Sequence, residues 1–109
     1  MSDRAARVSA LLIAIREEME TQQLWAEQSP SAEALASTQP FGVDTLTFSE
    51  WIQWLMIPRL QMMIAQQMPL PQNSNIHAMA EEVFKTLATD TAQLEELIRQ
   101  LDDALNVRH

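Results

Sequence analysis

The side chains best able to do chemistry in this sequence are a histidine and several paired carboxylates. His77 and Glu81 lie four residues apart, so on a helix they share one face and could supply two ligands to a metal ion. A di-metal helical bundle needs two Glu-x-x-His elements, and none occurs here. The other histidine, His109, is the last residue. We therefore predict no metal site and interpret His77 and Glu81 as an ordinary surface pair.

Four acidic doublets could suggest carboxylates that work together on a substrate. They are Glu17-Glu18, Glu81-Glu82, Glu95-Glu96 and Asp102-Asp103. Adjacent residues of a helix point about 100° apart, so the two carboxylates of a doublet do not converge on one substrate atom. The doublets are therefore predicted to lie on solvated helix faces.

Composition excludes several other classes of catalytic site. The sequence has no cysteine, which excludes disulfides, thiolate metal sites and a cysteine nucleophile. Its one glycine, Gly42, leaves no glycine-rich loop to bind phosphate. A serine nucleophile would depend on His77, and no strand-turn-helix pattern presents such a serine. We predict no catalytic residue and no cofactor, and expect that the protein is not an enzyme.

Arg59 is the charged residue whose position most needs an explanation. It follows Pro58 in an otherwise apolar segment, where a buried unpaired charge would be unfavourable. The favoured interpretation is that Asp44, Glu50 or loop carbonyls pair with the guanidinium, with Asp44 preferred. The alternatives are a contact with a ligand or partner, or a side chain extended into solvent.

Trp51 and Trp54 lie three residues apart and would share one side of a helix. Core packing is the favoured interpretation, and Trp51 in particular is predicted to be core. The alternative is a groove for an aromatic ligand, lined by the two indole rings.

The helices that position these residues follow from the spacing of apolar side chains. Amphipathic stripes predict helices over 3–23, over 76–87, and from a cap at Asp90 through Leu105. Ser29-Pro30 predicts the start of a short helix over 31–36, and an irregular connection follows over 37–46. The expected fold is all-α: a compact bundle of about four main helices plus one short helix.

The best-marked helix is the central one, over about 47–68. Thr47 and Glu50 match a capping box, in which each side chain binds the backbone amide of the other residue. The helix is apolar nearly all round, so we expect neighbours to enclose it. Pro58 lies inside it, cannot donate a backbone hydrogen bond, and predicts a kink.

Size and charge limit the remaining possibilities. A length of 109 residues indicates one domain, 1–109. The formal net charge of −8 disfavours direct nucleic-acid binding, because an acidic chain repels phosphates. No apolar window reaches the roughly 20 residues that cross a bilayer, and the short apolar stretch near the N-terminus continues into a charged helical pattern. We expect no membrane span and no signal peptide, and a cytoplasmic location.

One block of the sequence is similar to a known family. The residues that carry the likeness are Ser37–Phe41, Asp44-Thr45, Glu50–Trp54, Ile57–Arg59 and Pro69–Pro71, with Trp25 at a further matching position. Together they resemble the YqcC-like family of small gammaproteobacterial proteins. The resemblance implies a compact bundle of about four helices and offers no family catalytic residues to carry over. It also implies a link to a tRNA pseudouridine synthase, whose gene commonly lies beside those of the family.

Three hypotheses of function remain. The first is a protein-binding accessory module, whose partner could be the neighbouring tRNA pseudouridine synthase; the low charge between Gln28 and Ala80 is typical of an interface core or a buried core. The second is a structural or regulatory homo-oligomer, for example a homodimer. The third is a small-molecule binder with a pocket near Trp54 and Arg59. The candidate contact residues are Gln39, Phe41, Trp54 and Arg59.

Overall fold

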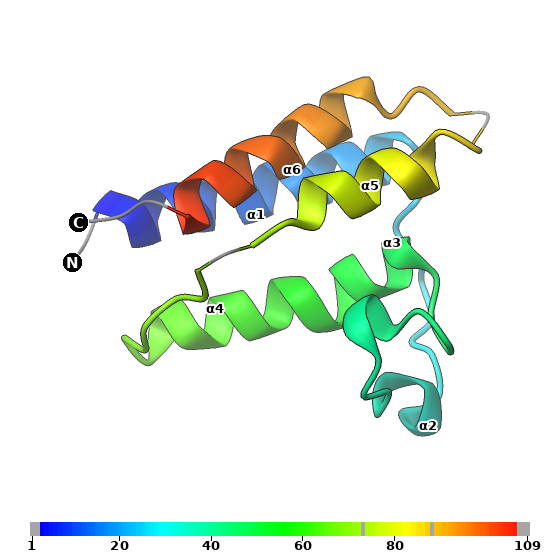
Figure 1. Ribbon diagram of the computed structural model, residues 1–109, viewed down its shortest axis with the longest axis horizontal. Coiled ribbons are helices and arrows are strands. Elements are labelled where there is room, and N and C mark those ends of the chain that lie inside the picture. Colours follow the sequence, from blue (N-terminus) through cyan, green and yellow to red (C-terminus); the bar gives the residue numbers. More distant parts are fainter. Residues whose placement is uncertain (1–2, 73, 88, 107–109) are drawn as a thin grey trace.

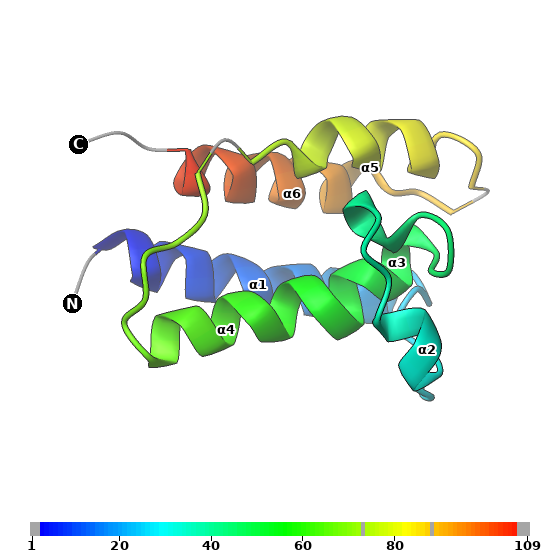
Figure 2. The same cartoon turned by 60° about the horizontal axis from the view of Figure 1, so that its bottom comes forward.

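The amphipathic stripes of the first and last predicted helices form the core. The computed structural model describes residues 3–72, 74–87 and 89–106, in which α1 (Asp3–Thr21) lies alongside α6 (Ala92–Leu105) (Figures 1 and 2). Helix α1 buries Val8, Leu11, Leu12, Ile15 and Met19, and α6 buries Leu94, Ile98, Leu101, Ala104 and Leu105. Both stripes were predicted, and both are confirmed.

The other elements pack around this pair. Helix α5 (Ile76–Phe84) covers α6. The short helix α2 (Ala32–Leu35) projects at the end of the bundle away from the start of α1 and the end of α6 (Figure 2). The 3-10 turn η1 (Pro40–Gly42) lies in the predicted irregular connection. The all-α bundle of four main helices and one short helix is thereby confirmed. In the described part of the chain, no helix is long and apolar enough to cross a membrane.

The helix predicted over 47–68 is continuous but not regular. It consists of α3 (Phe48–Trp51), the π-helical turn η2 (Ile52–Met56) and α4 (Ile57–Ala65). Thr47 Oγ1 accepts from the Glu50 amide at 3.1 Å, and Glu50 Oε1 accepts from the Thr47 amide at 2.8 Å, as the capping box predicts. In η2 the Ile57 amide donates to the Ile52 carbonyl, five residues back. A kink was predicted near Pro58, and the irregularity that the structure shows there is this wider turn, which comes directly before the proline.

The expectation that neighbours enclose this helix on all sides is wrong. One side buries Phe48, Ile52, Met56, Ile57 and Leu60 against the core. The other side faces solvent, and Met62 is 46% exposed. An apolar helix can be partly exposed because apolar atoms make up much of any protein surface. Three hollows of the molecular surface border this helix, and two of them contain predicted contact residues.

Side chains cap the ends of two helices. Asp102 of α6 is only 7% exposed, and its carboxylate accepts hydrogen bonds from the Ile76 amide at 3.0 Å, the His77 amide at 2.7 Å and the Ser74 hydroxyl. It therefore caps the N-terminus of α5 from a different helix. This corrects the prediction that the doublet Asp102-Asp103 lies wholly on a solvated face. At the short helix, the cap is Ser31 rather than Ser29.

Candidate functional site

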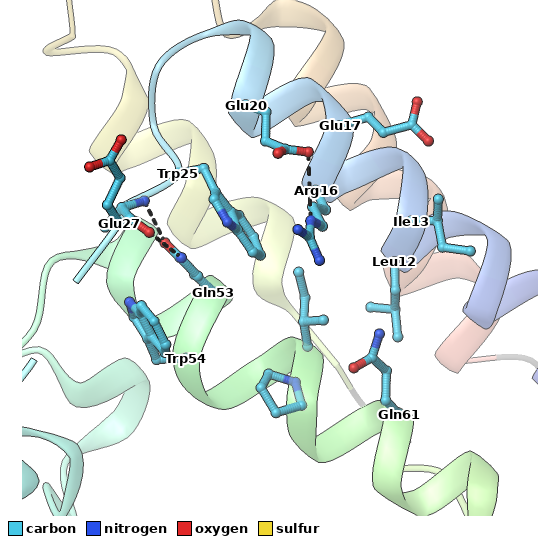
Figure 3. A pocket seen from close by; sticks show the side chains of 13 residues that line it. Leu12, Ile13, Arg16, Glu17, Glu20, Trp25, Glu27, Gln53, Trp54 and Gln61 are labelled. Carbon is cyan, nitrogen blue, oxygen red and sulfur yellow. Dashed lines mark hydrogen bonds and ion pairs between the residues drawn. The ribbon is translucent and has the colours of Figure 1, made fainter. Parts of the chain in front are cut away.

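The larger hollow lies between α1 and the central helix, and we call it the Trp25–Trp54 groove (Figure 3). Its volume is about 790 Å³. It is lined by Leu12, Ile13, Arg16, Glu17, Glu20, Trp25, Ala26, Glu27, Gln53, Trp54, Ile57, Pro58 and Gln61. Two indole rings and several aliphatic side chains thus share one surface with three carboxylates and one guanidinium.

Arg16 is already engaged inside the groove. Its Cζ lies 4.9 Å from the centroid of the Trp25 ring, and its Nε lies 3.6 Å from Glu20 Oε1 (Figure 3). This combines a cation–π contact with an exposed ion pair. Glu17 and Glu27 are exposed, and in the described part of the chain their carboxylates have no ion pair. The unpaired charge of the groove is therefore negative.

Gln53 fixes the loop that carries Trp25. Its side chain is 5% exposed, accepts from the Ala26 amide at 2.8 Å and donates to the Ala26 carbonyl at 2.7 Å. These paired bonds attach the loop after α1 to the central helix (Figure 3). Gln53 was not among the predicted contact residues. The available signal was a polar residue between Ile52 and Trp54, on a helix whose neighbouring positions are apolar.

Trp54 lines the groove but leaves one polar atom unsatisfied. Its indole Nε1 is buried and has no hydrogen-bond acceptor in the part of the chain that the structure describes. A buried donor without a partner is uncommon and costs free energy. The prediction that Trp54 is core or groove-lining thus has a mixed outcome, because its ring is half-buried and borders the groove.

The second hollow, the Phe41–Arg59 pocket, lies where η1, the central helix, α5 and α6 meet. Its volume is about 290 Å³. It is lined by Phe41, Trp51, Met56, Arg59, Leu60, Pro71, Ser74, Asn75, Ile76 and Leu105. Phe41 meets Trp51 edge to face with ring centroids 4.8 Å apart. Phe48 stacks on Trp51 at 5.8 Å behind them. Trp51 is therefore half-buried at the edge of the core rather than inside it.

The π-helical turn builds one wall of this pocket. In a regular α-helix, Trp51 and Met56 would point about 140° apart, because each residue advances by about 100°. In a π-helical turn, which is closed by a hydrogen bond over five residues, the side chains of Trp51 and Met56 lie closer to the same face of the helix. Trp51, Met56 and Leu60 consequently line the same hollow. The irregularity directly before Pro58 thus shapes one wall of this pocket.

The structure separates the four predicted contact residues. Phe41 and Arg59 line one pocket, whereas Trp54 lines the other. Gln39 is exposed and lines neither of these two hollows. The small-molecule hypothesis predicted one pocket near both Trp54 and Arg59. This prediction is wrong, because the two side chains line different hollows. Arg59 faces a pocket with Trp51 instead.

The predicted pairing of Arg59 with Asp44 is also wrong. Asp44 accepts from the Ser37 hydroxyl at 2.5 Å, within its own loop. Arg59 is exposed and has no hydrogen bond or ion pair within the described residues. The loop stays at the N-terminal end of the helix, and Arg59 lies eleven residues beyond Phe48, or roughly 16 Å along the axis. Because the guanidinium of Arg59 is solvated, it does not need the buried carboxylate partner that was predicted from the sequence.

Several other ionisable groups form surface pairs. His77 Nδ1 lies 3.2 Å from Glu81 Oε1, as the spacing predicted. On α6, Arg99 bonds Glu96 and Asp103, and the hydrogen bond from Arg99 lowers the pKa of Glu96 to about 2. Within the described ranges, no group of three or more His, Cys, Asp or Glu side chains could hold a metal ion. The absence of a metal in the native protein stays a prediction.

Comparison with known proteins identifies the family. A family model, DUF446, described as tRNA pseudouridine synthase C, matches residues 7–104. The chain belongs to this family. Its relatives include the uncharacterized protein YqcC of Escherichia coli K12, 35% identical over 101 residues that cover 91% of this chain and 90% of that protein. An uncharacterized protein of Haemophilus influenzae is 38% identical over 85 residues, which are 72% of this chain and 80% of that protein.

Two further matches bear on the fold and on the family description. The solution NMR structure of YqcC from E. coli matches this DUF446 chain with a TM-score of 0.83 and 26% identity, over 99% of this chain and 96% of that one. A tRNA pseudouridine synthase C of Pectobacterium carotovorum is 31% identical over 70 residues. Those residues are 64% of this chain but only 19% of that protein. The predicted resemblance to the YqcC-like family is confirmed.

Proposed function

We propose that this DUF446 protein is a non-catalytic accessory module that docks onto a tRNA pseudouridine synthase. The observation that carries the proposal is the Trp25–Trp54 groove, an open surface with two indole rings and an exposed Ile13. Aromatic side chains at the centre of a hollow surface are typical of protein interfaces. The partner class comes from the family description and from the Pectobacterium synthase, of which one fifth resembles this chain.

Charge supports the same partner class. The chain carries a formal net charge of −8, and Glu17 and Glu27 at the groove have no ion pair among the described residues. An enzyme that binds tRNA needs basic surface to meet the phosphates. An acidic module is attracted to such a surface, which speeds association and makes it sensitive to salt.

The test is co-purification of the tagged chain with the tRNA pseudouridine synthase C encoded in the same genome. We expect a complex of defined stoichiometry by size exclusion with light scattering, weaker as salt concentration rises. The isolated chain should leave the pseudouridine content of tRNA unchanged. If the chain alone elutes as a dimer and does not bind the synthase, the homo-oligomer hypothesis replaces the docking proposal.

A matched pair of variants tests the groove. Ile13 in the groove is 56% exposed, and Val43, which lines neither of the two hollows, is 59% exposed. Ile13→Gln should weaken synthase binding about tenfold, because it removes apolar contact area from the interface. Val43→Gln should not change it. Equal effects of the two substitutions, or none, would place the docking surface elsewhere.

A further inference from the structure

Arg59 differs from most basic side chains of this protein. Within the described residues, Arg4, Arg16, Lys85 and Arg99 form hydrogen bonds or ion pairs with the protein. Only Arg7 and Arg59 form neither. Arg7 is exposed on α1 and lines neither hollow. Among the basic side chains that the structure describes, Arg59 is therefore the unengaged one that borders a pocket.

The pocket beside Arg59 is predominantly apolar. Apart from Arg59, its lining has no charged residue, and Asn75 adds a side-chain amide that has no partner within the described residues. Phe41 and Trp51 supply aromatic walls, with ring centroids 4.8 Å apart. A concave apolar surface with one cation and one amide is the usual composition of a site for a small organic anion.

The backbone that presents Phe41 is held in an unfavourable conformation. Phe41 has a φ of 57°, in the left-handed region that bulky residues rarely adopt. Gly42 follows with a φ of 58°, and a Cβ at this position would lie 2.8 Å from Leu46 Cδ1. The loop therefore tolerates two consecutive left-handed residues to place the Phe41 ring against Trp51. Such strain is commonly found at binding sites.

We propose that the Phe41–Arg59 pocket binds a small carboxylic acid with an aromatic body. The guanidinium of Arg59 would bind the carboxylate in a charge-assisted pair. The aromatic body would pack against Phe41 and Trp51. A monoanion suits the site better than a phosphate dianion, because the pocket supplies one cation and the whole chain is acidic. This site is separate from the Trp25–Trp54 groove, and its function does not depend on docking to a synthase.

The test is an NMR titration of the full-length protein with phenylacetate, 3-phenylpropionate and indole-3-acetate. The indole N–H signal of Trp51, assigned with Trp51→Phe, should shift with a Kd on the order of 1 mM. The matched neutral alcohols should bind at least tenfold more weakly, because they lack the charge that Arg59 recognises. Acetate, which lacks the aromatic body, should cause no shift at comparable concentration.

Arg59→Met and Arg7→Met form the matched pair of variants. Both remove an exposed, unengaged cation, so both should melt within a few degrees of wild type. Arg59→Met should weaken binding of the acids at least tenfold, and Arg7→Met should leave it unchanged. The proposal is wrong if the acids and the alcohols bind with equal affinity, or if Arg59→Met binds the acids as tightly as wild type does. It is also wrong if no acid shifts the Trp51 signal at ligand concentrations up to about 20 mM. Shifts confined to Trp25 and Trp54 would also overturn it.

Discussion

At the scale of single residues, the polar atoms that matter most are buried ones. Gln53 and Asp102 satisfy backbone groups of other segments, whereas the Trp54 indole N–H has no acceptor in the described part of the chain. A satisfied buried group contributes little net stability but is costly to lose, and an unsatisfied one already costs about 1–3 kcal/mol. Substitutions that remove a satisfied buried group should therefore lower the free energy of unfolding, whereas removal of the unsatisfied Trp54 donor should leave it unchanged or raise it.

Trp54→Phe should leave the protein as stable as wild type, within about 1 kcal/mol, or make it more stable. The substitution removes the unsatisfied donor and keeps an aromatic ring at the groove. Trp51→Phe is the control, because Trp51 is half-buried in the aromatic cluster and is not left with a buried unpaired donor. We expect Trp51→Phe to be the more destabilising of the two in urea denaturation. A loss above about 2 kcal/mol for Trp54→Phe would contradict this account.

Asp102→Ala should destabilise the protein by about 3 kcal/mol or more. It leaves the amides of Ile76 and His77 without their acceptor and removes the cap of α5. Asp103→Ala is the matched control, since Asp103 is exposed and, within the described residues, its carboxylate bonds Arg99 alone. Asp103→Ala should shift the melting temperature by no more than a few degrees. Similar melting temperatures for the two variants would show that Asp102 does not act as a cap.

At the scale of elements, α6 carries a charge network with a defined pH dependence. The hydrogen bond from Arg99 lowers the pKa of Glu96 from 4.5 to about 2. A carboxylate with a lowered folded-state pKa contributes stability above its unfolded pKa and loses it as pH falls toward the folded value. Between about pH 4.5 and 2, wild type should therefore lose melting temperature faster than Glu96→Gln. Parallel curves for the two proteins would mean that this pair does not contribute. The effect should be small, because both side chains are partly exposed.

The helices were predictable because their signals are local. The amphipathic stripes of α1 and α6 and the capping box at Thr47 depend on residues within one or two turns. What the central helix packs against is not local: it is apolar all round, yet only one side is buried. The spacing of apolar residues shows which faces of a helix are apolar, but not how many neighbouring elements cover those faces. The sequence also predicted a kink near Pro58, but not a π-helical turn placed before the proline.

At the scale of the whole molecule, the candidate sites depend on contacts that no short pattern reveals. Phe41 and Arg59 were predicted as contact residues and do line one pocket, but the neighbour of Arg59 there is Trp51, not Trp54. Asp102 was predicted to lie on a solvated face together with Asp103. Its hydrogen-bond partners, the amides of Ile76 and His77, are more than 20 residues away in sequence, so no local pattern reveals them. Chain topology determines such contacts, and periodicity cannot.

Arg4 has a consequence for the connectivity that this fold permits. Its guanidinium donates to the carbonyls of Ala104, at 2.8 Å, and Leu105, so the beginning of α1 lies against the end of α6 (Figure 1). Domains whose chain ends are adjacent tolerate circular permutation and insertion into a host chain.

A permutant that joins residue 106 to residue 3 through a short Gly-Ser linker, and opens between Thr86 and Leu87, should fold with wild-type helicity by circular dichroism. An unfolded permutant would show that the α5–α6 connection must be intact for folding. If the permutant folds, the order of the helices along the chain is exchangeable, and the bundle could be carried within a larger enzyme as readily as beside it.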